Sequence, residues 1–264
     1  MTLSFIIVTH NSAHDIGPLL TSFFEFEPTL DYELIIVDNY SNDDSVNIIR
    51  SFTSDKIKLY DRKVRNGFGN NCNYGLAKST GDIVAFINPD IVFLENSFDK
   101  LVEYFKTSSY GIIGPRLLNS DYTIQYSARK FITLKLFLVR IMNKGQDHVD
   151  TQAMRTYFYD GLVTDKVIDV DWVTGAAMFV KREVINDIKG GFDEVYTMYI
   201  EDQDICFMAK MHGWKTGYYP YTRILHHHQR NSIMKFSKKT RYHLTGFFIF
   251  FFKKLFSIKN RLVK

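Results

Sequence analysis

The first ninety residues alternate short apolar runs with helix-like segments, and this alternation limits the fold more than any other feature. The apolar runs lie at residues 3–8, 33–37, 57–60 and 83–87. Short runs rich in β-branched residues are typical of strands that are buried on both faces. Helix-like segments lie between them: one that Ser12 is expected to cap, one at residues 43–52, and one that ends near residue 79. The pattern predicts an α/β fold with a doubly wound, mainly parallel sheet.

The second half of the chain gives weaker signals. Residues 173–180 predict a buried strand, residues 202–211 a helix and residues 223–225 a late strand. Residues 131–170 give no assignment.

Composition excludes several classes of protein. With 264 residues and 45% apolar side chains, the chain can bury a core without disulfides or structural metals. Two cysteines, Cys72 and Cys206, cannot form a disulfide framework or a four-thiolate zinc site, and both are expected to be small core residues. The N-terminal residues lack the features of a secretory signal, and the longest apolar run, residues 247–252, is too short to span a bilayer. We therefore expect a reducing, cytoplasmic compartment.

Polar residues follow each of the four predicted strands. They are Thr9-His10-Asn11, Asp38-Asn39-Tyr40-Ser41, Arg65-Asn66-Gly67 and Asn88-Pro89-Asp90. Ligands of open α/β sheets bind beyond these carboxyl ends. No glycine-rich dinucleotide fingerprint and no phosphate loop follows the first strand, which argues against NAD, FAD and ATPase chemistry. A carboxylate such as Asp38 can accept the N3–H of a pyrimidine, and one such as Asp90 can hold a hard cation that bridges phosphates.

Several short segments occur in a defined order along the chain. They are residues 5–11 (FIIVTHN), 35–39 (IIVDN), 66–69 (NGFG), 73–75 (NYG), 86–90 (FINPD), 172–176 (WVTGA), 191–194 (GFDE), 199–206 (YIEDQDIC) and 225–228 (LHHH). In this order the sequence resembles family 2 glycosyltransferases of the GT-A fold, on their rhamnosyltransferase-like branch. The resemblance spans about residues 3–232.

The resemblance implies a role for each matching residue. Asp202 would be the general base, and Asp90 and His226 would bind Mg²⁺ or Mn²⁺. The nucleotide-sugar donor would be bound by Thr9, Asn11, Asp38, Asn39, Asn66, Gly67, Asn88, Asp90 and Arg129. The acceptor would contact Trp172, Thr174, Gly175 and Glu201.

Structural alternatives exist for several of these residues. Asp202 and Asp204 stand near a helix start, where acids also stabilise the helix dipole. His226 and the two histidines after it could suggest a zinc cluster, but neighbours on a strand point to alternating faces. Arg129 could be an ordinary exposed arginine, and Trp172 an ordinary core residue.

The last 35 residues differ in charge from the rest of the chain. Residues 230–264 contain ten Lys or Arg and no acid, which leaves 23 basic and 29 acidic side chains in the other 229 residues. This distribution does not favour nucleic-acid binding, which would spread basic charge over one face of the domain. Leu244, Phe248, Phe251, Leu255, Ile258 and Leu262 form one apolar helical stripe. The segment predicts an amphipathic helix on a membrane surface; a helix docked on the domain, or on a second copy in a homodimer, is the alternative.

Together these features predict a domain at residues 1–232, with a nucleotide-binding half (1–118) and an acceptor-binding half (119–232), followed by a basic, Phe-rich amphipathic tail (233–264). The expected enzyme is an inverting, metal-dependent glycosyltransferase on the inner face of the cell membrane. It would move L-rhamnose from dTDP-rhamnose to a polyprenyl-diphosphate-linked glycan of a cell-surface polysaccharide. The alternatives are a UDP-hexose or UDP-N-acetylhexosamine donor and a catalytically silent nucleotide-sugar-binding partner. A nucleotidyltransferase is disfavoured, because no Gly-rich loop with Lys or Arg follows the first strand.

Overall fold

The computed structural model describes residues 2–96, 98–142, 151–227 and 238–262. Its elements in chain order are β1 (Leu3–Thr9), α1 (Ala13–Glu25), β2 (Tyr32–Asn39), α2 (Ser45–Ser51), β3 (Ile57–Arg62), α3 (Phe68–Lys78), β4 (Ile83–Ile87), β5 (Ile91–Phe93), α4 (Phe98–Thr107), β6 (Tyr110–Leu118), β7 (Ala128–Arg129), α5 (Leu134–Met142), α6 (Gln152–Tyr157), the 3₁₀ turn η1 (Tyr159–Leu162), β8 (Ile168–Val170), β9 (Trp172–Val173), β10 (Ala177–Lys181), α7 (Arg182–Asp187), α8 (Glu201–Met211), β11 (Lys215–His226) and α9 (Lys238–Leu262).

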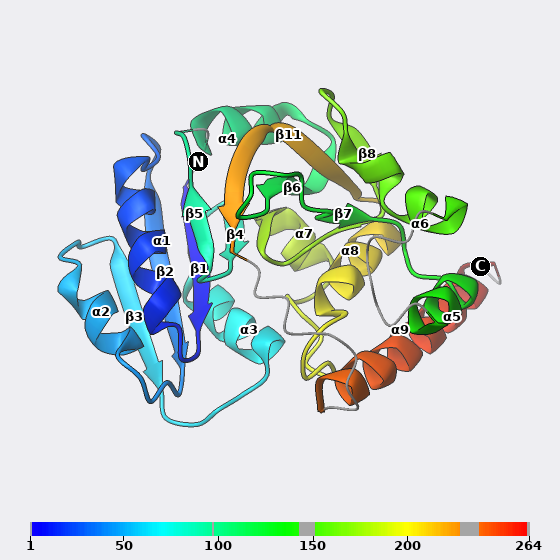
Figure 1. Cartoon of the computed structure of the whole chain (residues 1–264), viewed down its shortest axis with the longest axis horizontal. Helices are drawn as coiled ribbons and strands as arrows, with labels where there is room; N and C mark the ends of the chain where they lie inside the picture. Colours follow the sequence, from blue (N-terminus) through cyan, green and yellow to red (C-terminus); the bar gives the residue numbers. More distant parts are fainter. Residues whose placement is uncertain (1, 97, 143–150, 228–237, 263–264) are drawn as a thin grey trace.

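One central sheet passes through the molecule, with helices on both faces (Figure 1). Its strand order is β3-β2-β1-β4-β10-β6-β11-β5, and β8 pairs with β11. Alternate residues of β1 face opposite cores: Ile6 and Val8 lie in the core shared with α3, α8 and α9, whereas Phe5 and Ile7 lie in the core shared with α1, α2 and α4. Successive side chains of a strand point to opposite faces, so a strand that is apolar throughout is buried by both layers.

The strand–helix alternation of the first ninety residues is confirmed. β1 pairs in parallel with β2 on one side and with β4 on the other, and β2 pairs in parallel with β3. One local prediction is wrong: the Ser12 side chain does not cap α1. Its hydroxyl accepts the His10 N–H, and the carboxylate of Asp43 accepts the Ala13 N–H at the helix start instead.

The predicted strand at residues 173–180 is two strands in the structure. β9 ends at Val173, and β10 begins at Ala177 and lies antiparallel between β4 and β6. The break occurs because other groups use the backbone atoms between the strands. The Gly175 N–H donates to Asp202, and the Ala176 carbonyl accepts the Asn88 N–H.

The late strand is longer than the three residues that the sequence predicted. β11 has 12 residues and pairs with β6, β5 and β8. Its register against β6 shifts between Tyr219 and Arg223, where Pro220 lies. Proline has no N–H to donate to a ladder, so it marks an irregularity in the strand.

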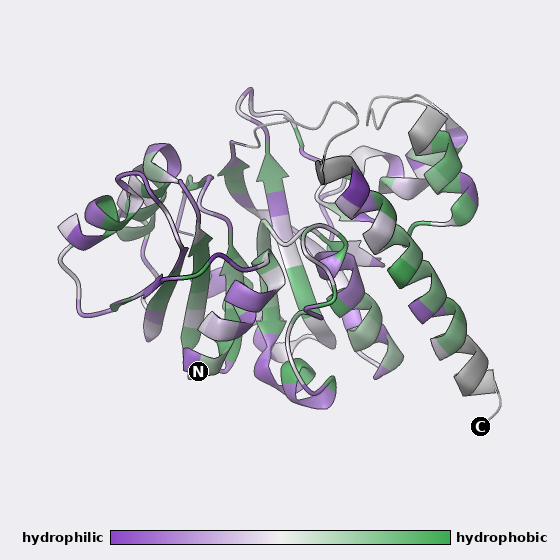
Figure 2. Cartoon of the chain, turned by 90° about the horizontal axis from the view of Figure 1, so that it is seen from below, coloured by the Kyte–Doolittle hydropathy of each residue, from purple (hydrophilic) through white to green (hydrophobic). Residues whose placement is uncertain are grey.

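The C-terminal segment contains a helix, α9, that packs on the domain. It runs along the outside of the molecule beside α5 and α8 (Figures 1 and 2). Phe247 and Phe250 are fully buried, and the ring of Phe247 stacks on Phe137 of α5 at 3.6 Å. None of the helices in the described parts of the chain has the length and apolar character needed to cross a membrane.

Candidate functional site

The predicted site residues come together where the parallel strands end. Thr9 of β1 lies opposite Asp38 of β2, and Ile7 of β1 lies opposite Ile87 of β4. β10 runs in the other direction, so its first residue, Ala177, lies beside Ile87 at the same edge. The turns after β1, β2 and β4 therefore border the segment between β9 and β10.

Asp38 is held rigidly at this edge. Its side chain is fully buried, and one carboxylate oxygen accepts the hydroxyls of Thr9 (2.8 Å) and Ser41 (2.6 Å). The other oxygen accepts the Ser41 N–H at 2.8 Å. A carboxylate offers about four lone-pair positions, so Asp38 retains capacity for one further donor. Sequence analysis did not assign a role to the Ser41 hydroxyl.

Asn39 connects β2 to the turn before α3. Its side-chain oxygen Oδ1 accepts the Asn66 backbone N–H at 2.8 Å, and its side-chain nitrogen Nδ2 donates to the Asn66 backbone carbonyl at 3.0 Å. Gly67 follows, and a Cβ there would lie 3.1 Å from the carbonyl oxygen of Thr197. The turn therefore packs closely against the loop that leads to α8. Asn11, which also lies at this edge, has φ of 51° and accepts the Asn42 N–H.

The side chains of Asp90 and His226, which the resemblance implies are ligands of one metal ion, are in contact. We call these two residues the metal pair. His226 Nε2 is 3.2 Å from Asp90 Oδ1, and β11 holds His226 opposite Ile91 of β5. Two ligands on adjacent corners of an octahedron with bonds of 2.0–2.1 Å would stand about 3 Å apart, so the pair fits a divalent cation. In the part of the chain that the structure describes, no three His, Cys, Asp or Glu side chains form a metal-binding group. This sparse set suits a cation whose other ligands are phosphate and water, and a mixed carboxylate–imidazole set suits Mn²⁺ better than Mg²⁺.

Asp202 stands in the first turn of α8 and faces the β9–β10 segment. Its Oδ2 accepts the Gly175 N–H at 3.2 Å, and its Oδ1 accepts the Gln203 N–H at 2.8 Å. Removal from water raises the pKa of the carboxyl, and the two N–H donors and the charge of Arg129 oppose this shift. A carboxylate whose pKa is raised toward neutrality is a stronger base than an exposed one.

Glu201 lies beside Asp202 in a drier environment. Only 6% of its surface is exposed, and within the described residues its Oε2 has no hydrogen-bond partner. Burial, followed by the neighbouring charge of Asp202, raises the pKa of Glu201 to about 8. At neutral pH this shift favours the neutral acid form of Glu201 in the folded chain.

The backbone before α8 is strained, and α9 supports it. Tyr199 and Ile200 have φ of 70° and 71°, a region that β-branched residues rarely adopt. Strain of this kind persists where the surroundings impose it. The Tyr199 ring stacks on His243 of α9 at 3.7 Å, and a Cβ on Gly246 would lie 3.1 Å from Ile200.

The remaining predicted residues lie around Asp202. Arg129 donates to the Tyr126 carbonyl and lies over the rings of Trp172 (5.2 Å) and Phe158 (5.4 Å). Trp172 is 6% exposed, and its indole N–H donates to the Lys130 carbonyl. Asn88 is tied by its N–H to Ala176, next to Gly175.

The hydroxyls of Thr174 and Ser127, beside this segment, have no hydrogen-bond partner among the described residues. Thr174 is a predicted acceptor contact, whereas no role was predicted for Ser127. The Thr174 N–H donates to the Ser127 carbonyl, so the two hydroxyl-bearing residues are neighbours. Buried hydroxyls of this kind are suited to hydrogen bonding with a hydroxyl-bearing ligand.

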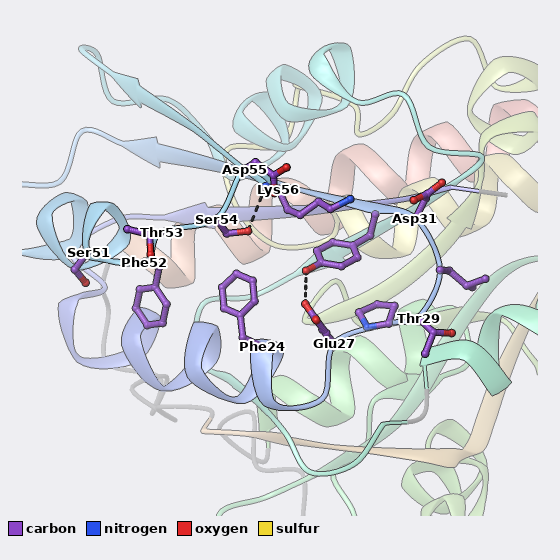
Figure 3. A pocket seen from close by; sticks show the side chains of 13 residues that line it. Phe24, Glu27, Thr29, Asp31, Ser51, Phe52, Thr53, Ser54, Asp55 and Lys56 are labelled. Atoms are coloured by element: carbon purple, nitrogen blue, oxygen red, sulfur yellow. Dashed lines mark hydrogen bonds between the residues drawn. The ribbon is translucent and has the colours of Figure 1, made fainter.

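A separate hollow of about 660 Å³ lies where β2 and β3 begin (Figure 3). Phe24, Glu27, Phe52 and Lys56 are among the residues that line it, and Glu27 accepts the Tyr32 hydroxyl at 2.7 Å. None of the predicted site residues lines this hollow. This hollow is therefore separate from the predicted site, which lies at the opposite edge of the sheet.

Solved structures with similar folds are glycosyltransferases. The chain matches the complex of GalNAc-T7 with UDP, GalNAc and Mn²⁺ with a TM-score of 0.66, at 14% identity over 93% of this chain and 47% of that one. It matches S. aureus TarS 1–349 in complex with UDP-GlcNAc with a TM-score of 0.63, at 16% identity over 90% of this chain and 61% of that one. The fold is therefore the GT-A fold of these glycosyltransferases.

The family follows from the sequence comparison. A family model described as Glycosyl transferase family 2 matches residues 4–181, and the chain belongs to this family. It is 28% identical to rhamnosyltransferase WbbL of Escherichia coli K12 over 200 residues, which is 71% of each chain. It is also 28% identical, over 55% of its length, to N-acetylglucosaminyl-diphospho-decaprenol L-rhamnosyltransferase of Mycobacterium tuberculosis. The match covers 47% of the mycobacterial enzyme.

Proposed function

We propose that this glycosyltransferase is an inverting, metal-dependent enzyme that transfers L-rhamnose from dTDP-rhamnose to a lipid-linked acceptor. The observation that carries the proposal is the approach of Asp90 to His226 at 3.2 Å, at the sheet edge that also holds the Gly175–Asp202 contact. The relatives named as rhamnosyltransferases favour rhamnose as the donor sugar.

The chemistry requires one displacement at the anomeric carbon. An acceptor hydroxyl oxygen forms the new bond to this carbon while the bond to the diphosphate oxygen breaks. Asp202 takes the hydroxyl proton, since the backbone N–H groups of Gly175 and Gln203 hold its carboxylate in place. A divalent cation on Asp90 and His226 would supply charge neutralisation for the departing diphosphate.

The donor would lie across the ends of β1, β2 and β4. Thr9 and Asp38 would receive the pyrimidine, with Asn11, Asn39, Asn66 and Gly67 at its border and Asn88 toward the diphosphate. On the other side, Arg129, Thr174 and Glu201 would border the acceptor. Trp172 would act through Arg129, since its ring packs under the guanidinium.

We further propose that the acceptor is a glycan on a polyprenyl diphosphate and that the enzyme binds the inner face of the cell membrane. A relative whose name contains diphospho-decaprenol supports the acceptor. Support for the membrane comes from α9, which docks with Phe247 and Phe250 but leaves Phe248, Phe252, Leu255 and Phe256 about half exposed. Exposed apolar side chains on a basic helix are suited to an anionic membrane surface.

The choice of donor nucleotide can be tested by measuring how much dTDP and UDP stabilise the purified protein. Each nucleotide is added with and without Mn²⁺. A ligand at 100 times its dissociation constant adds about 2.7 kcal/mol to the free energy of unfolding. Mn²⁺-dependent stabilisation by dTDP, followed by turnover of dTDP-rhamnose, is the expected result. Preference for UDP would contradict dTDP-rhamnose as the donor but leave the proposed mechanism unchanged. A response to neither nucleotide would contradict the proposed donor site.

A further inference from the structure

A turn after β6 carries a chain of hydrogen bonds that ends on His226. The turn, residues 119–125, is closed by the Asn119 N–H donating to the Thr123 carbonyl and the Gln125 N–H donating to the Leu117 carbonyl. Sequence analysis assigned no role to these residues, because they form no motif. Their relevance comes from the position of the turn next to the end of β11.

Four side-chain contacts connect the turn to the metal pair. Thr123 Oγ1 lies 2.6 Å from Asp121 Oδ1, and Asn119 Nδ2 lies 2.9 Å from Thr123 Oγ1. Gln125 Nε2 lies 3.1 Å from Asn119 Oδ1, and His226 Nδ1 lies 2.6 Å from Gln125 Oε1. The neighbouring ring of His227 faces Ser120 of the same turn, with Nδ1 3.0 Å from its hydroxyl.

The direction of every bond follows from the carboxylate at the far end. An aspartate carboxylate only accepts, so the single Thr123 hydroxyl proton points to Asp121. Thr123 must then accept from the Asn119 amide nitrogen, which turns the Asn119 oxygen toward Gln125. Gln125 donates to that oxygen and presents its own oxygen to the histidine.

Because the Gln125 oxygen only accepts, Nδ1 of His226 must carry a proton. Nε2 faces Asp90 Oδ1, 3.2 Å away, and is the ring nitrogen that a cation shared with Asp90 would bind. A nitrogen needs a lone pair to bind a metal, and the hydrogen bond on the other ring nitrogen sets the tautomer.

We propose that Gln125, oriented by Asn119, Thr123 and Asp121, is a positioning residue that holds His226 in the Nδ1–H tautomer for a divalent cation shared with Asp90. This inference rests on the metal site of the proposed function. It adds a group of residues that act through His226 and do not touch the donor or acceptor.

Nitrogen-15 NMR of the histidine rings in the full chain tests the tautomer without metal or donor. The His226 signals are assigned by their loss in His226→Asn. We expect the Nδ1–H form in the wild type, loss of that preference in Gln125→Leu, and its retention in Gln125→Glu, which keeps an acceptor oxygen. A wild-type ring that carries no proton on Nδ1 would overturn the proposal.

A second experiment tests whether Gln125 raises the affinity of the site for Mn²⁺. Binding is measured in the presence of dTDP or UDP from the electron paramagnetic resonance signal of the free ion. Loss of a metal-orienting partner typically weakens metal affinity about 10–100-fold. We expect this loss in Gln125→Leu, substantial recovery in Gln125→Glu, and no change in Gln152→Leu, which replaces an exposed glutamine of α6. Unchanged affinity in Gln125→Leu would contradict the role. Absence of Mn²⁺ binding by the wild type would refute the metal site itself, whereas the NMR result would still report on the tautomer.

Discussion

Two adjacent carboxyl groups at the start of α8 have different hydrogen-bond partners. Asp202 accepts two backbone N–H groups, whereas Glu201 has an oxygen without a partner in the described part of the chain. Burial raises the pKa of both groups, and for Glu201 to about 8. A neutral Glu201 keeps a second negative charge away from Asp202, so the two residues can have separate roles.

Asp202→Asn is expected to lower turnover by about 10²–10⁴-fold, the usual contribution of a general base, while nucleotide binding stays within a few-fold of the wild type. The amide keeps the shape of the side chain but cannot take a proton. Steady-state kinetics and calorimetric titration with the nucleoside diphosphate separate the two effects. Asp165→Asn, at a side chain that is 99% exposed, is the matched control. Wild-type turnover in the Asp202→Asn variant would show that Asp202 is not the general base.

Glu201→Gln is expected to change how stability depends on pH. Between about pH 4.5 and 8 the folded wild type holds a proton that the unfolded chain has released, so its free energy of unfolding falls as pH rises. The slope is at most about 1.4 kcal/mol per pH unit. The glutamine variant lacks this loss, so its stability relative to the wild type should increase from pH 5 to pH 8. Urea unfolding at several pH values measures the difference in free energy of unfolding between the two proteins. If this difference does not change with pH, Glu201 is ionised in the folded wild type.

At the scale of elements, α9 and α8 are joined by a partly buried ion pair. Lys253 Nζ lies 2.7 Å from Asp204 and 2.9 Å from Asp193. The Asp204 side chain is 2% exposed, and its second oxygen accepts the Tyr196 hydroxyl. The positive charge of Lys253 therefore compensates a carboxylate that is almost fully removed from water.

Lys253→Met is expected to lower the free energy of unfolding by about 2–3 kcal/mol. Breaking a fully buried pair costs about 3–5 kcal/mol, and Lys253 is a quarter exposed, so solvent reduces the loss. Adding Asp204→Asn should recover part of the loss, because the uncompensated charge disappears. Urea unfolding measures all three chains, with Lys106→Met on exposed α4 surface as the control. An equal loss in the control would show that general charge, and not this pair, is responsible.

The sequence predicted the elements whose pattern is local. β1, β2 and β4 are mainly apolar runs flanked by turns, and each has predicted site residues at or directly after its end. The strands of the second half were missed or misjudged because their pairing is not local. β9 has two residues, and β11 mixes tyrosine, proline and arginine along a shifted register. Gln125 could not be found from the sequence, because its role depends on a turn that tertiary structure places beside His226.

At the scale of the whole molecule, α9 presents two faces. The predicted stripe included Phe248 and Leu255, which are 48% and 53% exposed, whereas the buried Phe247 and Phe250 make the contact with the domain. Docking on the domain and membrane contact can therefore use different residues of the same helix.

Replacing Phe252 and Phe256 with serine is expected to weaken binding to phosphatidylglycerol vesicles by at least about tenfold, since burying each phenyl ring in an apolar environment is worth roughly 1.5–3 kcal/mol. Both side chains are more than half exposed, so folding should not change. Deleting the helix would be a poorer test, because it would also uncover Phe131 and Phe207, which contact Phe250.

Cosedimentation at low and high salt measures the binding. Val64→Ser and Val163→Ser, at residues that are 68% and 82% exposed, are matched controls. Undiminished sedimentation of the double phenylalanine variant would show that this face of α9 is not the membrane contact.

The ion pair between α8 and α9 also has a consequence for protein synthesis. Lys253 follows Asp204 by 49 residues, so a ribosome completes the catalytic helix well before its cationic partner emerges. Until then, Asp204 lacks this compensating charge, and the strained turn before Glu201 lacks its support from His243 and Gly246. We therefore expect the turn before Glu201 and the environment of Asp204 to reach their final geometry only when α9 docks, late in the folding of each new chain.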